Sequence, residues 1–185
     1  MLDDEVKAVL EANRYPTTGS TLVMLYLFPG EGVSRPDRLL SCEKQLLYKG
    51  YTLWHTAVEA ITLPYHTPTL ARPTASSLAA HDYAGRFARC KGAAAVLAVD
   101  TGGIVAGLGE YPLFAVAGKE AHTTPMENGA SDSVLRRLGI AACRTAGIMA
   151  VERPVETGQL KEYGELFAVT PQGCLSIRSS DGHLY

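Results

Sequence analysis

The chain has 185 residues, of which 46% are hydrophobic, and it carries a formal net charge of −2 at pH 7. This length and composition allow a sizeable buried core and exclude an intrinsically disordered chain. The slight negative charge argues against non-specific binding to nucleic acid or to a membrane surface, since both need an excess of positive charge. Small anionic ligands stay compatible with it.

The first residues, MLDDEVKAVLEANRY, begin with acidic side chains where a secretory signal would have basic residues followed by an apolar run. No uninterrupted apolar stretch of the sequence is long enough to span a bilayer. We therefore expect a cytoplasmic protein that uses no membrane segment.

The first part of the chain predicts one helix and several extended segments. Acidic residues at positions 3–5 favour a helix start, and Val6, Val9 and Leu10 predict its buried face. The apolar stretch STLVMLYLF (20–28) predicts a strand, and two further extended or mixed segments follow at 37–50 and 51–63. The stretch PYHTPTLARPT (64–74) holds three prolines and predicts a linker.

The stretch TASSLAAHDYAGRFARCKG (74–92) predicts a helix that ends at Gly92, with an apolar face of Leu78, Tyr83, Phe87 and Cys90. A strand in AAAVLAVD, a tight turn at Gly102 and Gly103 and a returning strand in IVAGLGE predict a hairpin. The stretch YPLFAVAG (111–118) continues the sheet.

A second amphipathic helix is predicted in SVLRRLGIAACRTAG (133–147), through Val134, Leu138 and Ala142. A strand in IMAVERPV (148–155), a short helical segment at 159–163 and two closing strands in 165–185 follow it. The whole order predicts a partial small lobe (1–63), a proline-rich connector (64–74) and a larger sheet-and-helix lobe (75–185).

The four cysteines are widely spaced, form no Cys-x-x-Cys pair and do not lie at ligand spacing from a histidine; they are Cys42, Cys90, Cys143 and Cys174. The five histidines are equally scattered. We expect reduced, mostly buried thiols and no metal site. A cysteine–histidine nucleophile has little support, because packing on a helix face or beside a strand accounts for Cys90 and Cys174.

Five stretches occur in an order that resembles the fold-type-IV pyridoxal-phosphate enzymes, which include class IV aminotransferases and aminodeoxychorismate lyase. They are VLAVDTGGIV, PLFAV, TTPMENGASDSVLRR, AGIMAVERPV and GELFAVTPQGCLSIRSSDG. The resemblance covers most of the chain, and residues 2–63 are similar to the second part of the family's small lobe. It implies an α+β fold in which a mixed-sheet larger lobe with helices follows a partial smaller α/β lobe. It also implies a homodimer and, if the protein is active, pyridoxal phosphate as cofactor.

Pyridoxal phosphate (PLP) needs a lysine that forms a Schiff base, an acid that faces its pyridine nitrogen, and backbone amides that bind its phosphate. In the family the lysine precedes the helix predicted at 75–91, but this chain has no lysine between Lys49 and Lys91, and the guanidinium of Arg72 cannot form the imine. The position of the family's acid corresponds to Gly107. The nearby Glu110 would face the opposite side of a strand, and we expect it in a surface turn.

The family's first phosphate contact corresponds to Ser133, Val134 and Leu135 at a helix N-terminus, where Leu135 lacks a hydroxyl and an ordinary helix cap is the alternative interpretation. The second corresponds to Thr170, which is followed by Pro171, a residue without an amide hydrogen. These losses favour a divergent relative without PLP catalysis that acts as a binding or assembly module. An active aminotransferase or aminodeoxychorismate lyase-like enzyme, with an amino acid or anionic ligand as substrate, is the alternative.

Overall fold

The computed structural model describes residues 2–15, 21–28, 37–43, 52–53, 57–63 and 75–185. The chain forms two compact units, Met1–Gly50 and Tyr51–Tyr185. This boundary lies earlier than the one expected after residue 63, because the strand at Val58–Thr62 pairs with strands of the second unit. The expected connector at 64–74 lies outside the described residues.

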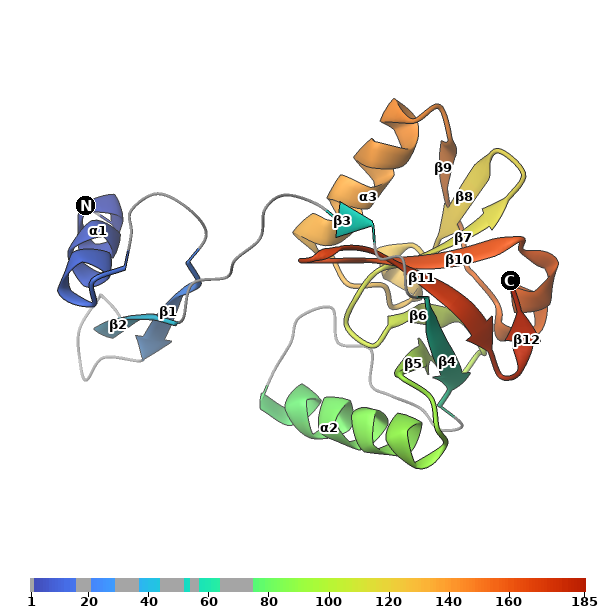
Figure 1. Ribbon diagram of the computed structural model, residues 1–185, viewed down its shortest axis with the longest axis horizontal. Helices are drawn as coiled ribbons and strands as arrows, with labels where there is room; N and C mark the ends of the chain where they lie inside the picture. The colour runs from blue at the N-terminus through green and yellow to red at the C-terminus, as the bar shows by residue number, and fades with distance from the viewer. Residues whose placement is uncertain (1, 16–20, 29–36, 44–51, 54–56, 64–74) are drawn as a thin grey trace. The chain divides into compact units, whose positions relative to one another are not determined.

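The described residues of the first unit form one helix and a two-stranded antiparallel sheet, as labelled in Figure 1: α1 (Leu2–Ala12), β1 (Val23–Phe28) and β2 (Asp37–Cys42). Both the predicted helix and the predicted apolar strand are confirmed. An ion pair between Arg38 and Glu5, with 2.5 Å between the side-chain atoms, joins β2 to α1.

The second unit is built on a ten-stranded mixed sheet with the order β6-β5-β4-β11-β10-β7-β8-β9. Its strands are β4 (Val58–Thr62), β5 (Ala95–Val99), β6 (Val105–Leu108), β7 (Leu113–Ala117), β8 (Glu120–Thr123), β9 (Met149–Glu152), β10 (Glu165–Thr170) and β11 (Gly173–Ser180), with β3 (Thr52–Leu53) and β12 (His183–Leu184) paired to β11. Two α-helices and two 3₁₀ helices accompany it: α2 (Ala75–Cys90), α3 (Val134–Thr145), η1 (Met126–Asn128) and η2 (Thr157–Glu162). The predicted α+β fold with a mixed sheet is confirmed.

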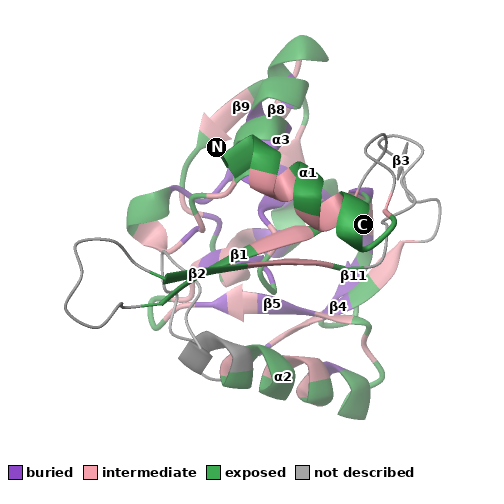
Figure 2. Cartoon of the chain, turned by 90° about the vertical axis from the view of Figure 1, so that its left-hand side faces the viewer, coloured by how far each residue is buried: buried purple, intermediate pink, exposed green. Residues whose placement is uncertain are grey.

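The described residues form three hydrophobic clusters, the two larger of which lie on opposite faces of the sheet, because successive side chains of a strand point to opposite faces. In β7, Leu113 and Ala115 belong to one core, whereas Phe114 belongs to the core under α3. In β10, Ala168 and Val169 divide in the same way. Figure 2 shows that the buried residues concentrate in the strands, while the outer side of α2 is exposed.

Helix α2 ends where the sequence predicts, but it presents a different face to the sheet. Gly92 has φ 76°, and the amide of Ala93 donates to the carbonyl of Ala88, as in a Schellman C-cap. The buried contact is made by Ala88, with Ala84 and Phe87 beside it, whereas Tyr83 and Cys90 are exposed. The predicted face is thus wrong at these two residues, because small alanines let the helix approach the strands; the side chain of Leu78 lies outside the described residues.

Helix α3 also turns a different face inward than its hydrophobic pattern predicts. Val134 and Leu138 are 67% and 51% exposed, and Ala142 is exposed too. The buried residues are Arg136, Gly139, Ile140 and Cys143. Gly139 explains this rotation, because a Cβ there would lie closer than 3.0 Å to the ring of Phe114. The helix therefore packs through the glycine onto an aromatic ring.

Among the described residues, no helix combines the length and the apolar character needed to cross a membrane.

Candidate functional site

The four residues predicted to contact a cofactor phosphate lie on two elements that pack against each other. Ser133, Val134 and Leu135 are at the N-terminus of α3, and Thr170 is the last residue of β10. The structure thus places the start of α3 and the end of β10 on packed elements, and the assignment of a phosphate site to them stays a prediction. Their polar groups, however, form hydrogen bonds within the helix cap and the β10–β11 turn.

Ser133 is the N-cap of α3. Its hydroxyl accepts a hydrogen bond from the Arg136 amide at 3.2 Å, and its own backbone is extended. Val134 points to solvent, and Leu135 packs partly buried against the core under α3. The cap interpretation is confirmed. The helix N-terminus keeps first-turn amides that favour an anion, but no hydroxyl stands at position 135 to support one.

The hydroxyl of Thr170 holds the turn that joins β10 to β11. It donates to the Gly173 carbonyl at 2.9 Å and accepts from the Gln172 amide at 3.2 Å, and Thr170 is buried. Pro171 has no amide hydrogen. The turn therefore uses, for its own closure, the hydroxyl that the resemblance assigns to an incoming phosphate, and position 171 offers no amide to bind one.

Gly107, at the position of the family's acid, faces a closed backbone turn. The carbonyl oxygen of Tyr111 lies closer than 3.0 Å to the place a Cβ of residue 107 would take, and the same carbonyl accepts the Leu108 amide at 2.8 Å. Glu110 lies exposed in this turn, as expected. An aspartate or glutamate at residue 107 would displace the turn, because its Cβ would collide with the Tyr111 carbonyl. The backbone path of this turn therefore excludes the family's acid at this position.

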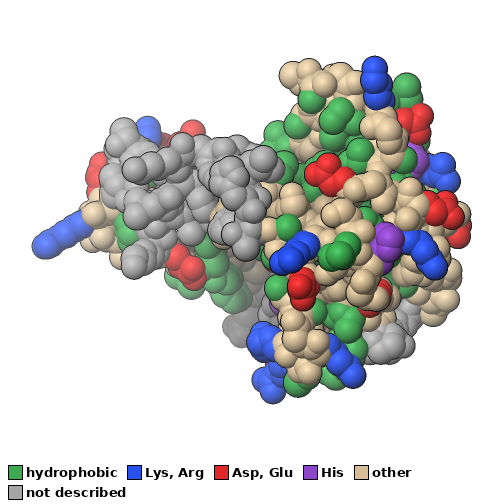
Figure 3. All heavy atoms as spheres, turned by 45° about the vertical axis from the view of Figure 1, so that its right-hand side comes forward, with side chains coloured by type: hydrophobic (Ala, Val, Ile, Leu, Met, Phe, Trp, Pro, Cys, Tyr) green, Lys and Arg blue, Asp and Glu red, His purple; other side chains and the backbone are tan. Residues whose placement is uncertain are grey.

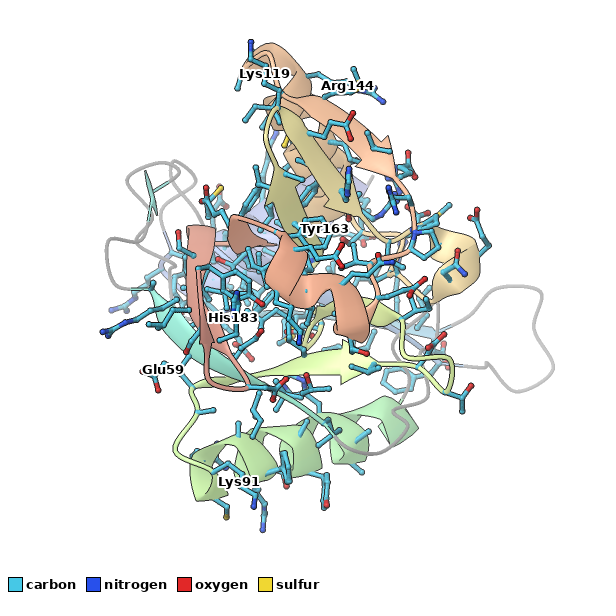
Figure 4. The ribbon with its side chains drawn as sticks, turned by 90° about the vertical axis from the view of Figure 1, so that its right-hand side faces the viewer. Glu59, Lys91, Lys119, Arg144, Tyr163 and His183 are labelled. Atoms are coloured by element: carbon cyan, nitrogen blue, oxygen red, sulfur yellow. The ribbon has the colours of Figure 1, made fainter. Side chains whose placement is uncertain are left out.

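The segment expected to carry the Schiff-base lysine holds Arg72 and no lysine, and both it and Lys49 lie outside the described residues. Lys91 follows the C-terminal end of α2, as Figure 4 shows. Since α2 has 16 residues, about 24 Å of helix lie between Lys91 and the segment before residue 75. Lys91 is exposed, and Figure 3 shows basic side chains gathered over α2. Its position fits a solvated surface charge.

A buried arginine, rather than a cofactor contact, organises the start of α3. Arg136 is 4% exposed and donates to Glu152 of β9 at 2.6 Å and to the Thr124 carbonyl at 3.2 Å. The Thr124 hydroxyl in turn donates to the Val105 carbonyl at 2.6 Å and accepts the Val155 amide at 3.2 Å. This network was missed at the sequence level. The sequence features that could have indicated it are Arg136 near the start of the helix and Glu152 in the stretch VERP (151–154).

A second polar network lies between β8 and η2. His122 is buried and contacts the Tyr163 hydroxyl through Nδ1 at 3.2 Å and the Glu120 carboxylate through Nε2 at 2.8 Å. Burial raises the pKa of Tyr163, so its phenol stays protonated at neutral pH. With both ring nitrogens engaged, His122 serves here as a satisfied packing residue.

The cysteines differ from the expectation of mostly buried thiols. Cys143 is buried, Cys42 and Cys174 are partly buried, and Cys90 is exposed at the end of α2. Burial raises the pKa of the Cys143 thiol, with the neighbouring Cys174 adding to it. Burial likewise raises the pKa of Cys174, with a smaller effect of Glu165. A raised pKa lowers the thiolate fraction and so the nucleophilicity of both thiols. The described residues hold no cluster of three or more His, Cys, Asp or Glu that could bind a metal.

No protein-family model matches the sequence, and comparison with curated proteins finds no match. Solved structures do match. A branched-chain amino acid aminotransferase from Escherichia coli has a TM-score of 0.78 at 20% identity, over 100% of this chain and 65% of its own. An aminotransferase from Brucella abortus, bound to PLP, has a TM-score of 0.77 at 19% identity, over 98% and 68%.

A putative 4-amino-4-deoxychorismate lyase from Legionella pneumophila has a TM-score of 0.74 at 17% identity, over 98% of this chain and 69% of its own. The chain therefore has the fold of the fold-type-IV PLP enzymes. Within that class, the matching structures include branched-chain aminotransferases and an aminodeoxychorismate lyase. The chain spans about two thirds of the length of these proteins, 65% for the enzyme from E. coli.

The residues of this chain do not fit PLP. The sequence has no lysine between Lys49 and Lys91, a Cβ at residue 107 would collide with the Tyr111 carbonyl, and the β10–β11 turn uses the Thr170 hydroxyl for its own closure. At these three positions the chain thus departs from the groups that the resemblance assigns to the cofactor.

Proposed function

We propose that this protein is a divergent class IV aminotransferase-like protein that lacks PLP catalysis and acts as a binding or assembly module. The observation that carries the proposal is the closed backbone at Gly107, where the Tyr111 carbonyl occupies the space of a Cβ. A lysine could in principle come from another segment, but an acid at 107 would require a rebuilt turn. Without an acid, the pyridine ring cannot act as an electron sink.

The retained fold supports a role in binding. A buried core under α3, the Ser133 cap and the Arg136–Glu152 pair hold the second unit together, whereas Gly107 and Thr170 do not offer the groups that PLP needs. A folded chain without the catalytic groups of its structural relatives is compatible with a binding or assembly function. We propose a cytoplasmic homodimer, and we assign it no nucleic-acid or membrane partner. An amino acid or a small anion at the start of α3 is the ligand class that the remaining amides suit.

The experiment is to incubate the purified protein with PLP, record the absorption spectrum, reduce with borohydride, and determine the intact mass and the peptide map. The Brucella abortus aminotransferase, which binds PLP, serves as the positive control. We expect a folded protein with no stoichiometric adduct and only scattered labelling of surface lysines.

An adduct on a single lysine, lost when that lysine is changed to alanine, would instead establish the alternative, an active aminotransferase or aminodeoxychorismate lyase-like enzyme. Lys91→Ala and Lys161→Ala form a matched pair, since both side chains are exposed and belong to different elements. Equal labelling of both variants and the unmodified protein indicates non-specific reaction.

A further inference from the structure

A groove of about 420 Å³ lies in the second unit, between the start of β4, the segment that follows α2 and the β11–β12 hairpin. Its lining includes three charged side chains, Glu59, Lys91 and Asp181, and one hydroxyl, that of Ser179. Figure 4 labels two of them, Glu59 on β4 and Lys91 after α2. Pockets for small molecules have volumes of about 300–1,000 Å³. The groove therefore has room for a small ligand.

A β-bulge in β11 turns Ser179 into this groove. Where β11 pairs with β4, Ile177 lies beside Val58, and both pack in the same core cluster. The next pair is Ser179 with Glu59, so Arg178 is an extra residue of β11. Without this extra residue, Ser179 would point to the face of Ile177, because side chains alternate along a strand. The bulge instead places Ser179 on the face of Glu59, and bulges that redirect a side chain in this way are common beside functional sites.

The face that Ser179 shares with Glu59 is the one that α2 covers farther along β4. Ile61, two residues after Glu59, packs in the cluster that contains Ala88 of α2. Leu184 of β12 pairs with Ser179 from the other side. Glu59, Ser179 and Leu184 thus form a row across three neighbouring strands, and this row is the floor of the groove.

The polar groups on this floor are free to bind a ligand. Ser179 is 8% exposed, and no group of the described residues forms a hydrogen bond with its hydroxyl. The adjacent Ser180 hydroxyl, in contrast, is bonded to that of Tyr185. The Glu59 side chain is exposed and forms no ion pair within the described part of the chain. Since a buried hydroxyl without a partner is unfavourable, a ligand that bonds to Ser179 is stabilised by satisfying it.

The charge of the groove favours a cation. Two carboxylates, Glu59 and Asp181, and one ammonium group, Lys91, give the lining a net charge of −1. Asp181 already accepts a hydrogen bond from the Thr62 amide at 2.9 Å, so Glu59 is the carboxylate that remains available. The C-terminal end of α2, just before Lys91, adds partial negative charge. One positive charge on a ligand balances this lining, whereas a second would be repelled by Lys91.

We propose that this groove binds a small organic monocation of the alkylammonium class. The ammonium group donates hydrogen bonds to the Glu59 carboxylate and to the Ser179 hydroxyl, which is free to accept one. The alkyl chain packs against the apolar side chains of the lining, Ile61, Ala93 and Leu184.

This site is separate from the positions considered for a cofactor phosphate, and the inference goes beyond the proposed function. Thr170 and Gly173 lie at the turn where β11 begins, whereas Ser179 lies near the end of that strand. The strand between Gly173 and Ser179 is about 20 Å long. A ligand in the groove therefore does not touch the β10–β11 turn.

The test is a titration of the isotope-labelled full chain with butylammonium chloride, followed by the NMR shifts of the backbone amides. Butanol is the uncharged control, sodium butyrate is the anionic control, and the ionic strength is held constant. We expect butylammonium alone to shift the amides around Glu59, Lys91 and Ser179 in a saturable way, because only this probe carries the positive charge that Glu59 binds.

Two variants test the assigned contacts. Glu59→Gln should raise the dissociation constant of butylammonium about tenfold or more, because it removes the charge that binds the ammonium group. Ser179→Ala should raise it about threefold or more, because it removes one acceptor. Glu110→Gln, at another exposed carboxylate of the second unit, is the matched control and should leave the constant unchanged. Thermal unfolding shows whether each variant is folded.

Butylammonium that gives no saturable shifts at the groove would overturn the inference. Equal shifts with butyrate, or an unchanged dissociation constant in a folded Glu59→Gln variant, would also overturn it. Each of these results leaves the proposed function standing. A PLP adduct on a single lysine, in contrast, would refute the proposed function without altering the butylammonium titration.

Discussion

Gly107 of β6 and Tyr111 of the following turn are in backbone contact, and this contact excludes a side chain at residue 107. The Tyr111 carbonyl oxygen lies where a Cβ would collide with it, and the Leu108 amide at 2.8 Å holds that carbonyl in place. The absence of an acid at this position is therefore coupled to the path of the backbone. A single substitution back to glutamate would not restore the family's arrangement.

Gly107→Ala should destabilise the protein by about 1–3 kcal/mol, because its methyl group overpacks the turn. Gly158→Ala is the matched control, since no atom lies within 4 Å of a Cβ there and its backbone carries no positive φ. Urea unfolding of both variants measures the difference. If Gly107→Ala were as stable as Gly158→Ala, the turn would be able to open, and the argument against an acid at 107 would fail.

Thr170→Val removes the hydroxyl that bridges Gly173 and Gln172 in the β10–β11 turn while it keeps the β-branched shape. Burying these two backbone groups without their partner should cost about 1–3 kcal/mol of unfolding free energy. In Thr145→Val, the control, the lost hydroxyl bonds the Ala141 carbonyl on the exposed surface of α3. We expect this variant to lie within about 0.5 kcal/mol of the unmodified protein. Equal losses in the two variants would mean that the Thr170 hydroxyl does not hold the turn.

Glu152→Gln should cost about 1–3 kcal/mol, because it leaves the buried Arg136 guanidinium with a weaker partner. The loss is limited, since the Glu152 side chain is 47% exposed whereas that of Arg136 is 5% exposed. Asp132→Asn tests a comparable pair, Arg137 with Asp132, in which both side chains are exposed, and it should change stability by less than about 0.5 kcal/mol.

The Arg136→Met variant and the double variant with Glu152→Gln complete a thermodynamic cycle for this pair. We expect the two effects to be non-additive, as they are for residues in direct contact. Additive losses would show that Glu152 acts on β9 independently of Arg136.

The unfolding free energy should fall as the pH rises above about 9, because burial holds the pKa of the Cys143 thiol above its ordinary value of 9.0. Between the ordinary and the raised pKa the unfolded chain releases a proton that the folded chain keeps, so higher pH favours unfolding. The stabilisation is complete below pH 9 and is lost through the folded pKa. Cys143→Ala should flatten the decline, and Cys90→Ala, at an exposed thiol, should not. Parallel curves for all three proteins would show that Cys143 does not titrate on unfolding.

The elements and their order were predictable because their signals are local. The acidic first turn of α1, the glycine stop of α2 and the serine cap of α3 each depend on residues within a few positions of one another. The same holds for the hairpin at Gly102 and Gly103, where the Asp100 carboxylate accepts the Gly102 and Ile104 amides. The buried faces of α2 and α3 were predicted less well.

The sequence predicted which positions belong to the candidate site, but it predicted only some of the contacts that their side chains make. Ser133 as a cap and Glu110 as a surface residue follow from spacing alone. The use of the Thr170 hydroxyl by its own turn, and the network around Arg136, depend on groups that the fold brings together. A single sequence does not show which of several polar side chains or backbone groups becomes the partner of Thr170 or Arg136, because these partners are set by the tertiary fold.

By itself, the sequence predicted most of the helices and strands and the lack of a lysine between Lys49 and Lys91, since periodicity and residue identity are properties of the chain. The α+β class was implied by the resemblance to a known family. The tertiary structure alone decided that α3 packs through Gly139 against Phe114, that β4 joins the larger sheet, and that Tyr111 closes the space at Gly107. These features arise from close packing between segments that are distant in sequence, where the size of one side chain sets the position of another element.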